Sequence, residues 1–232
     1  MRLDVLPDAA QGAARAAAVI AADAREAVAA RGRFVMAVSG GHTPWIMLRA
    51  LAGEDVPWKA VHVAQVDERV APAGDPDRNL THLRESLLSH APIPPEQIHA
   101  MPVESADLEA AASAYARTLE GLAGAPAVLD LVHLGLGPDG HTASLVPGDP
   151  VLSVVDRDVA VTGVYMGRRR MTLTYPVLDR ARRVLWLVTG AEKAPMLPRL
   201  MRSDGSIPAG RVRPDAALIV ADRAAAAGLA PA

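Results

Sequence analysis

One loop of this sequence carries side chains suited to acid–base chemistry. Asp139 and His141 lie two residues apart within the segment Gly135 to Ser144, among three glycines that permit a sharp turn and a close backbone approach to a ligand. The apolar run 128–134 before them predicts a buried strand. Because binding groups gather on loops beyond the carboxyl ends of strands, we expect His141 to be a general acid or base rather than a solvated loop histidine.

A second loop has the composition of a phosphate-binding site. It follows the apolar strand 34–38, precedes a helix that starts at Pro44, and comprises Ser39, Gly40, Gly41, His42 and Thr43. Free backbone N–H groups at such a helix start bind anions, and phosphate is the expected guest. The lysine of the P-loop and the glycine spacing of a dinucleotide fingerprint are both absent from this loop. The alternative is an ordinary helix start with Thr43 as its N-cap.

Two more strand ends carry charged side chains. Asp67 and Arg69 follow the strand 61–66, where they can hold sugar hydroxyls or stabilise developing negative charge. The alternative for this pair is a surface ion pair. Lys193 follows the strand 184–188 and lies in the first turn of an expected helix, where the helix macrodipole disfavours a cation.

The rarity of lysine strengthens the interpretation of Lys193. Of the 24 basic residues, only Lys59 and Lys193 are lysines, so a compact ammonium at the second position suggests a task such as pairing with phosphate. Arg168, Arg169 and Arg170 form a basic run, and we expect one of them, Arg170, to meet an anionic substrate. The alternative is that the whole run is solvated.

The elements that must position these side chains alternate along the chain. Apolar periodicity predicts helices at 9–31, 44–52, 77–89 (with Asp77 as N-cap), 105–122, from 191 onward and at 224–227, and strands at 34–38, 61–66, 128–134, 170–174, 184–188 and 217–220. Continuous apolar strands between helices predict a three-layer α/β fold. In it a mostly parallel, Rossmann-like sheet carries helices on both faces. We expect residues 1–232 to form one α/β domain.

Composition excludes several classes of function. The chain has 232 residues, half of them apolar, a net charge of -2 and no cysteine, so disulfides and thiolate chemistry are excluded. Neither nucleic-acid nor membrane binding is expected, because the charge is balanced and no apolar run approaches the ~18 residues of a bilayer span. Without a signal-peptide pattern, we expect a cytoplasmic protein, either a monomer or a small homo-oligomer. No metal or cofactor is expected, since the remaining histidines are scattered.

The strand ends taken together resemble the 6-phosphogluconolactonase family, within the superfamily that also contains glucosamine-6-phosphate isomerases and deaminases. The matching stretches are 37–44, 66–69 with 75–79, 134–145, and 170–174 with 187–194. The Gly-Pro-Asp-Gly-His-Thr-Ala-Ser string from Gly137 and the Val-Thr-Gly-Ala-Glu-Lys string ending at Lys193 are highly specific in combination. One departure is His42, where the family often has serine, so a side-chain contact there is in doubt while the backbone site remains.

The resemblance implies an isomerase/deaminase-like fold and hydrolysis of a phosphosugar lactone, 6-phospho-D-glucono-1,5-lactone, to 6-phosphogluconate in the oxidative pentose phosphate pathway. The resemblance also implies that three elements hold the phosphate: the loop from Ser39 to Thr43, then Lys193, and then Arg170. His141 is the catalytic base, with Asp67, Arg69 and Asp139 lining the sugar ring. Either Asp139 or Asp67 orients the imidazole, and either Arg69 or backbone N–H groups of the glycine loop stabilise the oxyanion.

Two rival functions remain open on the sequence. Glucosamine-6-phosphate deaminases resemble this chain, but they carry a glutamate a few residues after the catalytic histidine, and 142–149 contains none. In the deaminases the corresponding motif is similar to Asp-Glu-Tyr, whereas this chain has Asp67-Glu-Arg69. A sugar-phosphate sensor with the same fold is the second rival, and such regulators usually carry a helix-turn-helix module for which this chain has no room.

Overall fold

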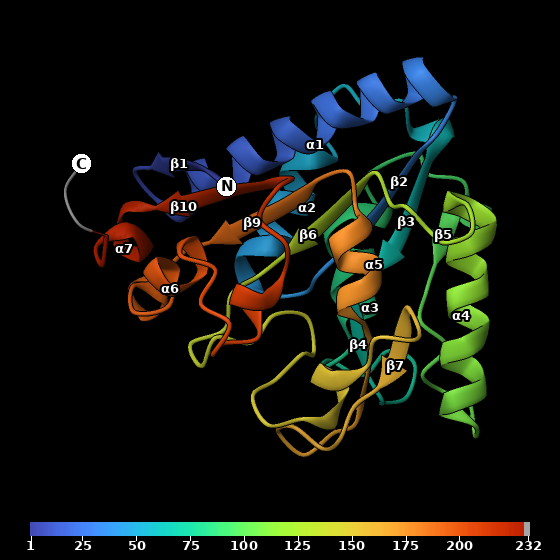
Figure 1. Cartoon of the computed structure of the whole chain (residues 1–232). Coiled ribbons are helices and arrows are strands. Elements are labelled where there is room, and N and C mark those ends of the chain that lie inside the picture. The colour runs from blue at the N-terminus through green and yellow to red at the C-terminus, as the bar shows by residue number, and fades with distance from the viewer. Residues whose placement is uncertain (230–232) are drawn as a thin grey trace.

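A parallel sheet of seven strands forms the centre of the fold (Figure 1). The computed structural model describes residues 1–229. Strand order is β1-β10-β9-β6-β2-β3-β5, and every neighbouring pair is parallel. The strands are β1 (Arg2–Leu6), β2 (Phe34–Val38), β3 (Val61–Gln65), β5 (Ile98–His99), β6 (Leu131–Leu134), β9 (Val184–Val188) and β10 (Ala217–Asp222).

Helices cover both faces of this sheet, which confirms the predicted three-layer architecture. The helices are α1 (Ala9–Arg31), α2 (His42–Leu51), α3 (Asn79–Leu83), α4 (Leu108–Ala123), α5 (Tyr175–Arg180), α6 (Leu197–Met201) and α7 (Arg223–Ala226). Short turns of 3₁₀ helix are η1 (Trp58–Ala60), η3 (Pro95–Gln97), η4 (Pro150–Ser153), η5 (Ala191–Lys193) and η6 (Ala209–Arg211), while η2 (Arg84–Leu88) is π-helical.

Alternating side chains of each strand divide the core into two parts. On β2, Phe34 and Met36 pack with α1, α2 and α3, whereas Val35 and Ala37 pack on the side of α4 to α7. Successive strand residues point to opposite faces, so a strand buried on both faces must be apolar throughout. The continuous apolar runs of the sequence are therefore explained by this double burial.

The order of the strands places a crevice at one edge of the sheet. From β2 the chain adds β3 and β5 on one side, and it later adds β6, β9 and β10 on the other. The topological switch point therefore lies between the carboxyl ends of β2 and β6, which is where open α/β sheets bind ligands. The loops that begin at Ser39 and at Gly135 leave the sheet at this point.

A second, antiparallel sheet packs beyond these strand ends. It consists of β4 (Asp67–Arg69), β8 (Arg170–Leu173) and β7 (Val159–Val161), in the order β4-β8-β7. Asp67 lies opposite Thr172, and Arg69 lies opposite Arg170. The predicted strand at 170–174 thus exists but belongs to this small sheet, which brings two charged segments over the end of the large one.

Several predicted boundaries are confirmed and others are wrong. The helix 9–31 is found as predicted, with the Asp8 side chain capping its start and Gly32 ending it in the left-handed conformation. The second helix starts at His42 rather than Pro44, and its N-cap is Gly41, so Thr43 is not a cap. Asp77 is not a cap either, because that helix starts at Asn79.

Candidate active site

A cavity of about 390 Å³ opens at the switch point of the sheet. This volume is in the range of small-molecule sites. Its lining comes from the carboxyl ends of β2, β6 and β9 and from the small sheet. The lining residues are Ser39, Gly40, Gly41, His42, Thr43, Pro44, Asp67, Arg69, Asn79, Gly135, Leu136, Gly137, Pro138, His141, Ala143, Arg170, Leu187, Thr189, Glu192 and Lys193.

The structure brings together nearly all residues that the sequence singled out. Ten of the eleven predicted site residues line this cavity, although they come from five separate stretches of chain. The eleventh, Asp139, lies behind His141 and reaches the cavity only through it. The roles assigned to these residues stay predictions, whereas their convergence on one cavity is a property of the fold.

His141 and Asp139 form a hydrogen-bonded pair at the end of β6. The Oδ1 atom of Asp139 lies 2.5 Å from Nδ1 of His141 and also accepts the backbone N–H of His141 at 3.1 Å. Burial raises the pKa of Asp139, but the bonds to the backbone and imidazole of His141 outweigh burial and lower that pKa below its ordinary value. An ionised carboxylate at Nδ1 places the proton on that nitrogen and leaves Nε2 as a base.

The choice between the two aspartates follows from this geometry. Asp139 contacts the imidazole, whereas Asp67 accepts a hydrogen bond from Ser144 Oγ at 2.6 Å and another from the Asn79 amide. Asp67 is 5% exposed and belongs to β4, so it faces the cavity from the side of the small sheet. The structure therefore pairs Asp139, and not Asp67, with His141.

The glycine-rich loop after β2 presents backbone N–H groups to the cavity. The first bond of helix α2 runs from Trp45 N to Gly41 O, so the N–H groups of His42 and Thr43 precede the helical pattern. The side chains of this loop serve its placement: Ser39 Oγ donates to the carbonyl of His133, and Thr43 Oγ1 bonds Thr189 Oγ1 at 2.7 Å. An anion bound at this loop would therefore meet backbone N–H groups rather than these two hydroxyls.

His133 supports this loop from within the sheet. It is fully buried on β6, and burial lowers the pKa of its imidazole to about 4. Its neutral Nδ1 atom accepts the backbone N–H of Ser39 at 3.4 Å, while its carbonyl accepts the Ser39 hydroxyl at 2.9 Å. The first residue of the loop is thus held to β6 by its main chain and its side chain.

The three consecutive arginines have three different environments. Arg168 pairs with Asp75 and Asp77, and Arg169 lies 3.8 Å from Glu109. Arg170 is 7% exposed, lines the cavity, and is the one of the three with an unpartnered buried Nε atom. Burial lowers the pKa of its guanidinium below the ordinary value, as does neighbouring Arg69, while Asp67 opposes the shift.

Arg69 and Lys193 supply the other cations of the cavity. Arg69 Nη1 donates to the carbonyl of Asp77 at 2.6 Å, and its Nε is buried without a partner. Lys193 lies in the short turn η5, and its Nζ atom is 3.6 Å from Glu192. The expected regular helix from 191 is therefore wrong at its start, since η5 precedes α6, which begins at Leu197.

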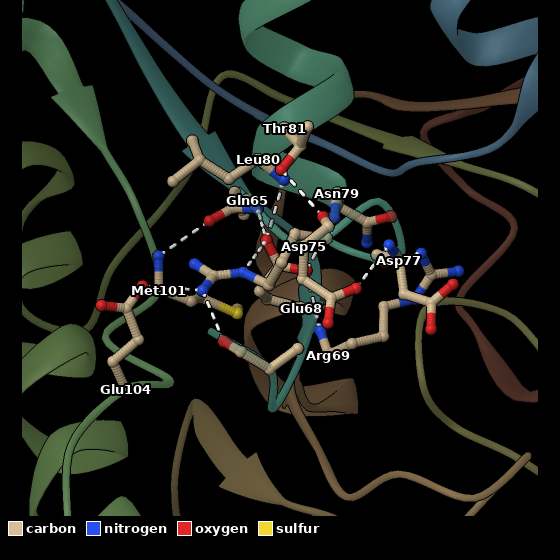
Figure 2. Close-up of polar contacts among 12 residues, drawn as sticks. Gln65, Glu68, Arg69, Asp75, Asp77, Asn79, Leu80, Thr81, Met101 and Glu104 are labelled. Carbon is tan, nitrogen blue, oxygen red and sulfur yellow. Dashed lines mark hydrogen bonds and ion pairs between the residues drawn. The ribbon is translucent and has the colours of Figure 1, made fainter. Parts of the chain in front are cut away.

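Glu68 holds the charged side of the cavity in place, and sequence reasoning missed it (Figure 2). Its side chain is fully buried. One carboxylate oxygen accepts the backbone N–H groups of Arg69 and Asn79, both at 2.8 Å. The other accepts from Leu80 N and from Gln65 Nε2, and forms an ion pair with Arg78 at 3.1 Å. Strand β4 and the start of α3 are thereby joined through one carboxylate.

Asn79 is a second cavity residue that the sequence did not single out. Its Nδ2 atom donates to the carbonyl of Asp67 at 2.9 Å, and its Oδ1 atom is buried without a partner. That oxygen lies so close to Gly40 that a Cβ there would be 1.9 Å away. For Glu68, the sequence did hold a signal. Asp67 and Arg69 flank it, and the middle residue of a strand whose neighbours face the cavity must point away from that cavity.

None of the helices within residues 1–229 is both long and apolar enough to pass through a membrane. In the same part of the chain, no three histidine, cysteine, aspartate or glutamate side chains are grouped to hold a metal ion.

The fold and the cavity define an α/β protein with a small-molecule site at the carboxyl ends of its parallel strands. The chain belongs to the family of glucosamine-6-phosphate isomerases/6-phosphogluconolactonase, whose model matches residues 7–220. The resemblance inferred from the four sequence stretches is thereby confirmed.

Individual relatives agree with this assignment. The chain is 39% identical over 214 residues to a 6-phosphogluconolactonase of Synechocystis, with 89% of each chain covered. It is 40% identical to that of Mycobacterium tuberculosis, with 88% of each covered. The solved 6-phosphogluconolactonase of Thermotoga maritima superposes with a TM-score of 0.85 at 26% identity, covering 95% of this chain and 98% of the other. A monomeric glucosamine-6-phosphate deaminase, 19% identical, shares the fold.

Replacing Glu68 by glutamine tests whether this carboxylate holds the fold around the site. We expect the free energy of unfolding to fall by about 3 kcal/mol, because Arg78 loses its buried counter-charge and an amide N–H group faces other donors. Urea unfolding would measure the change. Glu104→Gln is the matched control: Glu104 pairs with the same arginine at 2.8 Å but is half-exposed, so its loss should cost less than about 1 kcal/mol. Equal losses in the two variants would contradict the assignment.

Proposed function

We propose that this chain hydrolyses 6-phospho-D-glucono-1,5-lactone to 6-phosphogluconate, a step of the oxidative pentose phosphate pathway. One observation carries the proposal. A single cavity is lined by His141, which Asp139 holds from behind, by the glycine-rich loop that starts α2, and by three cations. Full-length relatives that are 36 to 40% identical carry the name 6-phosphogluconolactonase, which supports it. Location in the cytoplasm and the state of monomer or small homo-oligomer stay predictions.

The chemical step requires a base, a proton donor and a site for negative charge. His141 Nε2 takes a proton from water as the water oxygen attacks the lactone carbonyl carbon. The ester bond to the ring oxygen then breaks, and the imidazolium returns the proton to that oxygen. Asp139, ionised and bonded to Nδ1, stabilises the imidazolium between these two events. No covalent enzyme intermediate is needed.

Charge on the carbonyl oxygen is stabilised from the small sheet or from the glycine loop. Arg69 lines the cavity with its Nε atom unpartnered, and the backbone N–H groups of Gly135 and Leu136 are the alternative donors, since Gly137 N already donates to His141 O. Asp67 and Asn79 supply acceptors for the hydroxyl groups of the sugar ring.

The phosphate binds at the loop that starts α2. The N–H groups of His42 and Thr43, with Lys193 and Arg170, are the groups lining the cavity that would hold it. His42 lines the cavity as a residue, and its imidazole is a further candidate contact for the same anion. Binding energy from the phosphate positions the lactone next to His141 without taking part in bond breaking.

Replacing His141 by alanine tests the proposed base. We expect kcat to fall about 100- to 10,000-fold with little change in KM, because the proton transfer is lost while the phosphate contacts remain. Lactone disappearance would be followed against the spontaneous rate, with EDTA present. A near-normal kcat would remove His141 from the mechanism. If the wild type does not accelerate lactone hydrolysis but releases ammonia from glucosamine 6-phosphate, the deaminase alternative is favoured. If it shows neither activity, a sugar-phosphate sensor is favoured.

Gly137 offers a test that leaves every polar group in place. A Cβ on this residue would lie 2.1 Å from Nδ1 of His141 and 2.7 Å from Oδ1 of Asp139. Gly137→Ala should therefore displace the imidazole and lower kcat by about 100-fold. Gly121→Ala is the control, since Gly121 lies on α4 outside the cavity and its added methyl group meets no atom within 4 Å, so kcat should stay within about twofold. Similar kcat values for the two variants would contradict the pairing geometry.

Lys193 and the exposed Lys59 form a second matched pair, since they are the two lysines of the chain. Lys193→Gln is expected to raise KM by about 10- to 100-fold, because a charged hydrogen bond to phosphate is lost. The Lys59→Gln variant should keep the wild-type KM in the same lactone assay. An unchanged KM for Lys193→Gln would place the phosphate elsewhere.

A further inference from the structure

Tyr165 contacts three residues of the proposed site although it does not line the cavity. Its hydroxyl donates to Oδ2 of Asp139 at 3.3 Å, on the oxygen that His141 leaves free. Its ring meets the His141 ring edge-on, with 5.7 Å between centroids. The guanidinium carbon of Arg170 lies 5.0 Å from the centre of the same ring.

The turn that carries Tyr165 is held from both sides. Tyr165 N donates to Arg168 O at 2.9 Å, and Arg168 N donates back at 3.3 Å, so that Met166 and Gly167 form a tight connection with positive φ angles of 50° and 79°. The Arg168 side chain is anchored by Asp75 and Asp77. The tyrosine therefore reaches the site from a defined position.

We propose that Tyr165 is a positioning residue with two separable parts: its hydroxyl orients Asp139 for His141, and its ring orients Arg170 toward the substrate phosphate. This inference rests on the proposed lactonase function. It assigns Tyr165 no contact with the substrate.

The hydroxyl defines the plane of the Asp139 carboxylate. Oδ1 is occupied by His141, and a donor on Oδ2 opposes rotation of the carboxylate about its Cβ–Cγ bond. Burial raises the pKa of Tyr165, and so do the charge of Asp139 and the hydrogen bond to it. The hydroxyl therefore stays protonated and remains a donor around neutral pH.

The ring holds Arg170 without neutralising it. No carboxylate within residues 1–229 makes an ion pair with Arg170, and the face of an aromatic ring attracts a guanidinium while leaving its N–H groups free. A carboxylate partner would compete with the substrate phosphate for this cation. The ring is therefore suited to keep the guanidinium in place and available.

The two parts predict different kinetic effects. Tyr165→Phe removes only the hydroxyl and should lower kcat about three- to tenfold at unchanged KM. Tyr165→Leu removes the ring as well, so it should in addition raise KM about threefold. The affinity for inorganic phosphate, measured by calorimetry, should also fall about threefold. Val164→Ala, in the same turn and 72% exposed, is the control and should match the wild type.

A double substitution separates positioning from general support of the fold. If the hydroxyl acts through Asp139, adding Tyr165→Phe to Asp139→Ala should change kcat no further. A wild-type kcat for Tyr165→Phe would overturn the inference, and so would an equal loss in the Asp139→Ala background.

Two readouts do not depend on turnover, so failure of the lactonase proposal is distinguishable from failure of this one. The imidazole ¹⁵N resonances of His141 should shift in Tyr165→Phe and stay constant in Val164→Ala. Phosphate affinity should fall in Tyr165→Leu alone. Unchanged resonances together with unchanged phosphate affinity would overturn the role of Tyr165 even if the wild type proved inactive on the lactone.

Discussion

The charged half of the site depends on one buried carboxylate. Strand β4 has three residues and α3 has five, and elements this short do not hold their position through their own hydrogen bonds. Glu68 joins them by accepting main-chain N–H groups from both, and Arg78 balances its charge. Burying an ion is costly unless it is paired and fully hydrogen-bonded, and Glu68 meets both conditions. Arg69, Asp67 and Asn79 take their places around this contact.

The site combines two structural units with different tasks. The large parallel sheet supplies the helix start at His42, the His141 loop and Lys193 from the ends of its strands. The small antiparallel sheet supplies Asp67, Arg69 and Arg170 from above those ends. Neither unit alone encloses the cavity, because the loop at the start of α2 belongs to one unit and most of the charged side chains belong to the other.

Local sequence patterns predicted the long apolar strands well, and the short and edge strands poorly. Long apolar strands such as β2 and β9, and the capped helix α1, carry strong periodicity. Strands of two or three residues, such as β4, β5 and β7, have too few residues to show a period, and the edge strand β1 was not expected. The candidate site residues were predictable because glycine-rich strand ends are distinctive in sequence. Glu68, Asn79 and Tyr165 act through contacts across the fold, which no local pattern contains.

The hydrogen bonds that shape the histidine loop span very short stretches of chain. Gly137 N donates to His141 O at 2.8 Å, Gly140 N donates to Gly137 O at 3.0 Å, and Asp139 binds the imidazole two residues away. The proposed acid–base pair is therefore held mainly by bonds within five consecutive residues, 137–141, with Tyr165 as a contact from outside. Because these bonds are local, changes in the segments that would recognise the sugar leave most of them in place. Substrate preference can then change separately from the proposed acid–base chemistry.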